Sequence, residues 1–98
     1  MKLKNRIAII TGGGKGIGAE LSLKLARESA KIIIDEMDVP NGELTAKKIR
    51  ENNGEAIVIK TNVADEDSVN NMANEAINVF GKIDILINNA GTRHINNI

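Results

Sequence analysis

Residues 7–18 read IAIITGGGKGIG and decide the fold. The apolar run that opens this stretch is rich in β-branched side chains, which predicts a buried strand. The glycines that follow predict a tight turn into a helix, because glycine has no Cβ to restrict the backbone. Such a turn lets a phosphate group approach the backbone, and the start of the helix offers free N–H groups and the positive end of its dipole. The stretch therefore predicts a strand, a phosphate-binding turn and a helix.

Three more short apolar runs follow along the chain, at residues 32–34, 56–59 and 83–87. Runs that are apolar on both faces are what parallel strands between two helix layers require. Longer amphipathic stretches separate the four runs, so the predicted element order is βαβαβαβ. With right-handed crossovers, this order predicts an α/β fold with a Rossmann-type, doubly wound parallel sheet. No internal linker is visible, and residues 1–98 are expected to form a single domain.

Helical spacing of apolar residues predicts what fills the gaps between these strands. The third helix has the clearest pattern, with Asp65 as its N-cap and Gly81 as its C-terminal stop. Its apolar stripe consists of Val69, Met72, Ala73, Ala76, Ile77 and Phe80. A first helix ends near Ser29. It is marked by Ile17, Leu21 and Leu25.

A weaker pattern predicts the middle helix over about residues 43–52. Leu44 and Ile49 are expected to face inward, and Gly54 follows the helix. Residues 40–42, which read Pro-Asn-Gly, are typical of a turn and are expected to precede the helix.

Composition excludes several classes of function. The 13 basic and 13 acidic residues give a net charge of zero, so there is no electrostatic reason to expect a nucleic-acid or membrane-surface partner. The chain has no cysteine and a single histidine, His94, so no metal site is expected. No apolar run approaches the ~20 residues of a membrane span or resembles the core of a signal peptide. We therefore expect a cytoplasmic protein.

The glycine turn matches neither of two general phosphate motifs. A P-loop needs a hydroxyl residue where Gly16 stands and a glycine where Ile9 stands. The G-x-G-x-x-G fingerprint fails as well, because the glycines are spaced as Gly12, Gly16 and Gly18. Taken alone, these glycines also fit a tight turn that binds nothing.

Two carboxylates, Asp35 and Glu36, close the second predicted strand. Dinucleotide folds place an acid there, about 20 residues past the glycine turn, to accept hydrogen bonds from the adenosine ribose. The alternative is a solvated strand end that leads into an acidic loop with Asp38. A negative charge here repels a 2′-phosphate and favours NAD over NADP. Lys15 in the turn favours NADP instead, because a basic side chain there is within reach of a 2′-phosphate. The alternative is that it is only a solvated lysine at the helix start.

Hydrogen-bonding residues also follow the third and fourth strands, in Thr61-Asn62-Val63 and in Asn88-Asn89-Ala90-Gly91. Open α/β sheets bind ligands outside the carboxyl ends of their strands, where the strand order reverses. Asparagines after strands are usually turn formers, so each segment alone is a weak signal. Together with the glycine turn, they predict one binding edge.

With these motifs in this order, the chain resembles the classical short-chain dehydrogenase/reductase family. Residues 11–18 match its T-G-x-x-x-G-x-G cofactor turn, residues 88–91 match its N-N-A-G segment, and residues 62–63 resemble its adenine-contacting pair. The resemblance covers residues 6–91 and gives Asn88 a structural role. It implies NAD, which is favoured, or NADP as the cofactor. The cofactor-binding residues would be Gly12, Gly14, Lys15, Gly16, Ile17, Gly18, Asp35, Glu36, Asn62, Val63, Asn89, Ala90 and Gly91.

The resemblance also indicates what these residues lack. The family transfers hydride between NAD(P) and an alcohol or ketone, 3-oxoacyl thioesters included, and uses a serine and a Y-x-x-x-K segment that follow the fourth strand. This sequence has no tyrosine, so no catalytic residue is expected in it. We interpret the chain as a cofactor-binding half, truncated after the fourth strand and unable to catalyse the reaction alone. The parent protein is expected to be a homo-oligomer.

Two other interpretations stay open. One is a non-catalytic dinucleotide-binding or interaction module, which would pair with another chain through an uncovered fourth strand. The other is a mononucleotide-binding module, because half of a dinucleotide fold is a mononucleotide site. Binding of AMP as tightly as NAD would favour the latter.

Overall fold

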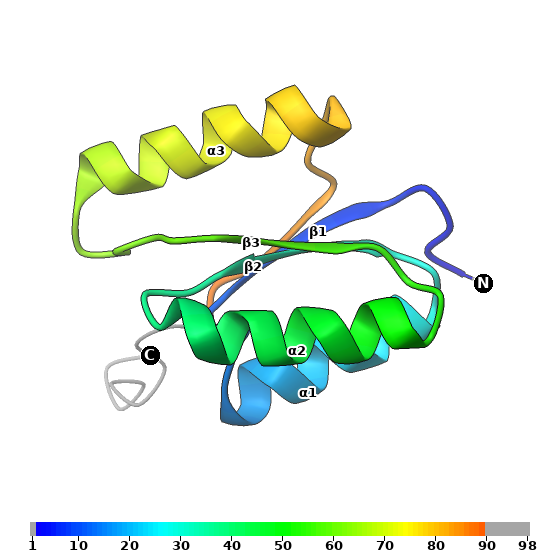
Figure 1. The fold of residues 1–98 in the computed structure, drawn as a ribbon. Coiled ribbons are helices and arrows are strands. Elements are labelled where there is room, and N and C mark those ends of the chain that lie inside the picture. The colour runs from blue at the N-terminus through cyan, green and yellow to red at the C-terminus, as the bar shows by residue number, and fades with distance from the viewer. Residues whose placement is uncertain (1, 90–98) are drawn as a thin grey trace.

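The computed structural model describes residues 2–89, in which helices cover both faces of one parallel sheet (Figure 1). The strand order is β3-β2-β1-β4, and every pairing is parallel. The predicted α/β class and element order are confirmed. Strand order reverses beside β1, because β2 and β3 lie on one side of it and β4 lies on the other. The elements are β1 (Ile7–Thr11), α1 (Gly16–Arg27), β2 (Lys31–Asp35), α2 (Val39–Glu51), β3 (Ala56–Ile59), α3 (Glu66–Phe80) and β4 (Ile85–Ile87).

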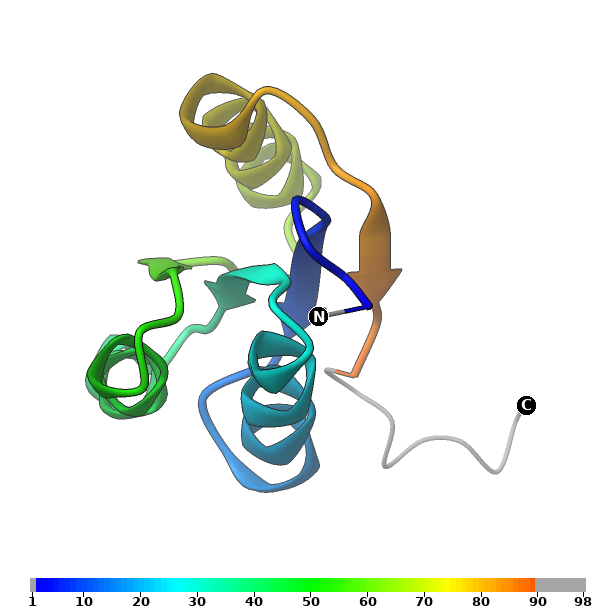
Figure 2. The same cartoon turned by 90° about the vertical axis from the view of Figure 1, so that its right-hand side faces the viewer.

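The sheet separates two helix layers. Figures 1 and 2 show α1 and α2 against one face of the sheet and α3 against the other. Ile10 and Ile34 belong to the core under α1 and α2. Ile9 and Ile33 pack with Met72 of α3 in a second core. Because successive strand residues alternate between the two cores, β1 and β2 are buried on both faces, which explains their continuous apolar runs.

Helix α1 packs against the core of the sheet through Leu23 and Leu25. Its buried residues are Gly18 and Ser22, whereas Ile17, one of the residues that predicted the helix, is 69% exposed. The hydroxyl of Ser22 donates to the carbonyl oxygen of Gly18 at 2.8 Å. The predicted stripe is therefore right at Leu25 and wrong at Ile17. At the start of the helix it is Gly18 that contacts the glycine turn, too closely for a larger side chain.

Helix α2 begins at residue 39, earlier than predicted, and the expected turn at residues 40–42 is its first turn. The carboxylate of Asp38 caps it by accepting a hydrogen bond from the N–H of Asn41 at 3.3 Å. Pro40 is tolerated there because the first turn of a helix leaves its N–H groups without intrahelical partners. Ile49 is buried as predicted, but the expectation for Leu44 is wrong, since 60% of it is exposed.

Helix α3 has the predicted ends. Asp65 caps it by accepting from the N–H of Asp67 at 3.0 Å, and Gly81 ends it with a left-handed φ of 84°. Met72 and Ala76 of the predicted stripe are buried. Val69 and Phe80, at the two ends of the stripe, also pack against this core, whereas Ile77 is 44% exposed.

Strand β4 is shorter than predicted, because residues 83–84 precede it rather than belong to it. The carboxylate of Asp84 accepts a hydrogen bond from the N–H of Ile7 at 2.8 Å. It also lies 3.2 Å from the Lys82 ammonium group and 3.5 Å from Arg6 Nη1. These contacts, the Ile7 hydrogen bond foremost, hold the pKa of Asp84 below its ordinary value.

Candidate functional site

The carboxyl ends of β1, β2 and β4 meet at the glycine turn. The N–H of Gly12 donates to the carbonyl oxygen of Asp35 at 2.7 Å, just past the last residue of β1. From the other side, Nδ2 of Asn89 donates to the carbonyl oxygen of Gly12 at 3.4 Å. Gly12 thus joins the ends of three strands at the reversal of strand order, where open α/β sheets bind ligands.

Two glycines of the turn are required for different reasons. A Cβ added at Gly18 would overlap the carbonyl oxygen of Gly12 and lie 2.6 Å from Nδ2 of Asn89. Gly16 has a φ of +51°, in the left-handed region, and a Cβ there would meet nothing within 4 Å. Packing therefore demands glycine at residue 18, and backbone conformation favours it at residue 16.

Glu36 fastens the glycine turn to the start of α2. Its Oε1 accepts a hydrogen bond from the N–H of Gly14 at 3.0 Å, and its Oε2 accepts one from the N–H of Asp38 at 3.3 Å. The hydroxyl of Thr45 in α2 donates to the carbonyl oxygen of Gly14 at 3.3 Å. A Cβ at Gly14 would lie 2.7 Å from the backbone nitrogen of Gly42, so turn and helix are in direct contact.

Lys15 lies beside this junction and pairs with Asp38. Its ammonium nitrogen is 3.5 Å from Oδ2 of Asp38, and the two side chains are 61% and 37% exposed. The backbone and side-chain hydrogen bonds of Asn41, followed by Lys15, lower the pKa of Asp38. The expectation of a solvated lysine is therefore incomplete, because its charge has a defined partner.

Helix α1 begins without a side-chain cap. Its N-cap residue is Lys15, whose side chain makes no capping bond, and its first turn holds no acidic residue. By contrast, Asp38 caps α2 and Asp65 caps α3. The cap and first turn of α1 thus supply no carboxylate of their own to the positive end of the helix dipole, an arrangement suited to a phosphate group.

The side chain of Asp35, the last residue of β2, points to the opposite face of the sheet from the side chain of Glu36, which follows the strand. Strand alternation places the Asp35 side chain on the α3 side with Ile33, in register with Thr11 and Ile59. Asp35 is 1% exposed, and neither carboxyl oxygen has a hydrogen-bond partner among the described residues. Burial raises the pKa of Asp35 to about 7. The alternative of a solvated strand end is wrong for both acids, since Glu36 is only 8% exposed.

The segment after β3 lies at the same edge and turns into α3. Oδ1 of Asn62 accepts a hydrogen bond from the N–H of Ala64 at 3.0 Å, and the hydroxyl of Ser68 accepts one from the N–H of Asn62 at 2.9 Å. Val63 is 46% exposed beside them. Asn62 therefore shapes the turn, and Val63 offers an apolar surface there.

The segment after β4 is described only in part. The hydroxyl of Thr11 donates to Oδ1 of Asn88 at 3.2 Å, so Asn88 ties β4 to β1. Asn89 contacts Gly12 as given above, whereas Ala90 and Gly91 lie outside the described residues.

Sequence reasoning missed two parts of the site. Asp38 is expected in an acidic loop but is the N-cap of α2, and an aspartate two residues before Pro40 is a recognisable helix-start signal. Thr45 carried no signal, because its bond to Gly14 arises only when α2 packs on the turn.

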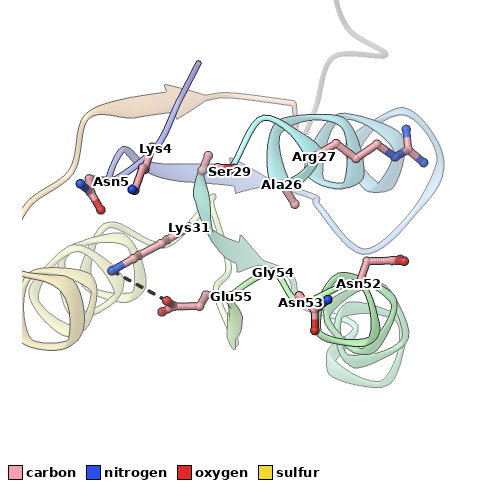
Figure 3. A pocket seen from close by; sticks show the side chains of 11 residues that line it. Lys4, Asn5, Ala26, Arg27, Ser29, Lys31, Asn52, Asn53, Gly54 and Glu55 are labelled. Carbon is pink, nitrogen blue, oxygen red and sulfur yellow. Dashed lines mark ion pairs between the residues drawn. The ribbon is translucent and has the colours of Figure 1, made fainter. Parts of the chain in front are cut away.

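A separate cavity of about 530 Å³ lies at the opposite edge of the sheet (Figure 3). Residues that precede β1, β2 and β3 line it, among them Lys4 and Asn5. The Lys31 ammonium group pairs with Glu55 across it at 3.9 Å. This cavity is remote from the glycine turn and plays no part in the site.

The described part of the chain limits other chemistry. Among residues 2–89, no three histidine, cysteine, aspartate or glutamate side chains gather as a metal site would require. No helix in that part is both long enough and apolar enough to cross a membrane.

Comparison with known proteins gives consistent matches. The sequence model of the family described as short chain dehydrogenase matches residues 6–98. An uncharacterized oxidoreductase of Thermotoga maritima is 36% identical over 96 residues, which are 98% of this chain and 38% of that protein. The short-chain dehydrogenase/reductase homolog YusS of Bacillus subtilis is 37% identical over 97 residues, 97% of this chain and 89% of that protein.

The fold has a counterpart among solved structures. A metagenomic short-chain oxidoreductase in complex with NADP superposes with a TM-score of 0.89 and 28% identity, over 93% of this chain and 41% of that one. This chain therefore spans less than half the length of that structure and of the Thermotoga relative.

Proposed function

Because the chain belongs to the short-chain dehydrogenase/reductase family, we propose that it binds a nicotinamide dinucleotide at the carboxyl edge of its sheet. One observation carries the proposal: the glycine turn at the uncapped start of α1 is hydrogen-bonded to Glu36 at the end of β2. A phosphate-binding turn and a ribose-binding carboxylate must be neighbours for one dinucleotide to reach both.

Each part of the edge then has a role. The N–H groups of Gly16, Ile17 and Gly18 at the start of α1 would hold the pyrophosphate. Gly12 and Gly14 would shape the turn, because their own N–H groups already donate to Asp35 and Glu36. Asn62 and Val63 would border the adenine. Asn89, Ala90 and Gly91 would pass along the nicotinamide ribose. When bound, the nicotinamide supplies the hydride that the family's reaction transfers.

Glu36 is the better of the two candidate ribose acids. Each of its oxygens accepts one backbone hydrogen bond, and an ionised carboxylate has about four acceptor positions, so ribose hydroxyls still find acceptors. Asp35 faces away from the glycine turn into the α3 side of the sheet, which removes it from this role. The negative charge of Glu36 supports NAD as the preferred cofactor.

The activity of the whole protein is a further part of the proposal. We infer reversible hydride transfer between NAD(P) and an alcohol or ketone, with 3-oxoacyl thioesters as one substrate class. These 98 residues contain no tyrosine to give or take the proton, so this chain alone should bind the cofactor without turning over a substrate.

A second candidate is a non-catalytic dinucleotide-binding module. The relative YusS supports it, because this chain matches 89% of the length of that protein.

Fluorescence of NADH tests the proposal directly, because the chain has neither tryptophan nor tyrosine to interfere. We expect saturable enhancement of nicotinamide fluorescence that NAD reverses more effectively than AMP. Equal competition by AMP would indicate a mononucleotide site instead. Oxidation of added NADH by a panel of ketones would contradict the expected lack of turnover.

A further inference from the structure

We propose that Asp38 is a cofactor-specificity residue, which holds the Lys15 ammonium group as a counter-ion and thereby denies it to a 2′-phosphate. The inference rests on the proposed dinucleotide site and concerns the choice between NAD and NADP there.

The position of the pair follows from the hydrogen bonds around Glu36. Gly14 and Asp38 each donate a backbone N–H to its carboxylate, one from the glycine turn and one from the start of α2. Lys15 follows Gly14, so the Lys15–Asp38 pair bridges the turn and the start of α2 beside Glu36. A ribose bound to Glu36 would therefore present its 2′ position next to this pair.

The two partners differ in how firmly they are held. Asp38 accepts from the N–H of Asn41 at 3.3 Å and from its Nδ2 at 2.7 Å, which fixes the carboxylate as a helix cap. Lys15 is 61% exposed on a long, flexible stem. The fixed anion thus determines where the mobile cation lies, and Asp38 remains ionised because its hydrogen bonds hold the pKa of its carboxyl low.

This arrangement resolves two opposite signals in the sequence. Glu36 disfavours a 2′-phosphate, whereas a free Lys15 would attract one. With Asp38 in place, a 2′-phosphate meets two carboxylates and a lysine whose charge is already paired. The edge as a whole then selects the cofactor without the phosphate.

The decisive variant is Asp38→Asn, because asparagine also caps helices well while it removes the charge. We expect NADPH affinity to rise relative to NADH by about 2- to 5-fold at low salt, the range that an exposed ion pair of up to ~1 kcal/mol allows. Glu55→Gln, which removes one negative charge at the opposite edge, should leave the ratio unchanged. Circular dichroism checks folding, and Asp38→Ser supplies a second capping variant.

A double-mutant cycle with Lys15→Met separates the two ways in which Asp38 can act. If Asp38 acts by holding Lys15, the gain in the NADPH-to-NADH ratio on replacing Asp38 shrinks in the Lys15→Met background. An equal gain in both backgrounds would overturn the inference, because Asp38 would then act only as a repelling charge. No change in the ratio would overturn it as well, with the dinucleotide site intact. Failure of every variant to bind either cofactor would instead refute the proposed function and the inference with it.

Discussion

Oε1 of Glu36 accepts a hydrogen bond from the backbone N–H of Gly14 at 3.0 Å, across 22 residues of sequence. This bond makes the end of β2 and the glycine turn one unit. The two sequence signals for a dinucleotide, an acid after the second strand and glycines after the first, are therefore physically coupled.

Glu36→Gln tests that coupling. Glutamine keeps the size of the side chain but lacks the charge and one of the two carboxylate oxygens, so one backbone N–H loses its acceptor. Because hydrogen bonds to charged groups contribute about 1.5–3 kcal/mol, we expect NADH binding to weaken about 10-fold or more and the midpoint of thermal unfolding to fall. Fluorescence titration and circular dichroism measure the two effects.

The matched control is Glu51→Gln at the exposed end of α2. It removes the same charge far from the glycine turn and should leave NADH affinity unchanged. If both variants weaken binding equally, Glu36 has no local role.

Alanine at Gly18 and at Gly16 should fail in different ways. At residue 18 the new Cβ overlaps the Gly12 carbonyl, so we expect a loss of about 1–3 kcal/mol or more in the free energy of unfolding, as for overpacked cores. At residue 16 there is free space but a φ of +51°, so the loss should be about 1–2 kcal/mol. Urea titration compares them, and a larger loss at residue 16 would contradict the packing described here.

Asp35→Asn should change how stability depends on pH. The folded-state pKa of about 7 lies above the ordinary 3.8. Between these two pH values only the unfolded chain loses the proton of Asp35, so the free energy of unfolding falls as pH rises. At about 1.4 kcal/mol per pKa unit, Asp35→Asn should gain about 2–3 kcal/mol more over wild type near pH 8 than near pH 5. Urea unfolding at the two pH values measures this gain. A gain independent of pH would show that folding does not raise the pKa of Asp35.

Much of this architecture was predictable from local sequence. Runs that are apolar on both faces predict strands β1 and β2, and Asp65 and Gly81 predict the two ends of α3. The inner face of α1 was predictable only in part, because Leu25 of the expected stripe packs against the core, whereas Ile17 is exposed. Contact with the glycine turn places Gly18 on that face, which an apolar pattern does not indicate. Helix α2 starts at the Asp38 cap and Pro40, but the sequence Pro-Asn-Gly is also typical of a turn, so a turn is predicted there instead of the first turn of the helix.

The candidate site divides in the same way. Spacing predicts both the glycine turn and Glu36 as binding residues, and in the fold the two are hydrogen-bonded to each other. The separate fates of Asp35 and Glu36 were not predictable, because adjacent strand residues point to opposite faces and only the packed sheet shows which face meets the turn. The Thr45 bond and the Lys15–Asp38 pair depend on how α2 packs against the turn.

Amide chemical shifts during titration with NAD test the central claim most directly, because they locate the binding site residue by residue. We expect saturable shifts at Gly14, Gly16, Ile17, Gly18 and Glu36. The amides of Lys31 and Asn53, at the opposite edge of the sheet, should stay in place. Shifts centred on that opposite edge, or none at millimolar NAD, would contradict a dinucleotide site at the glycine turn.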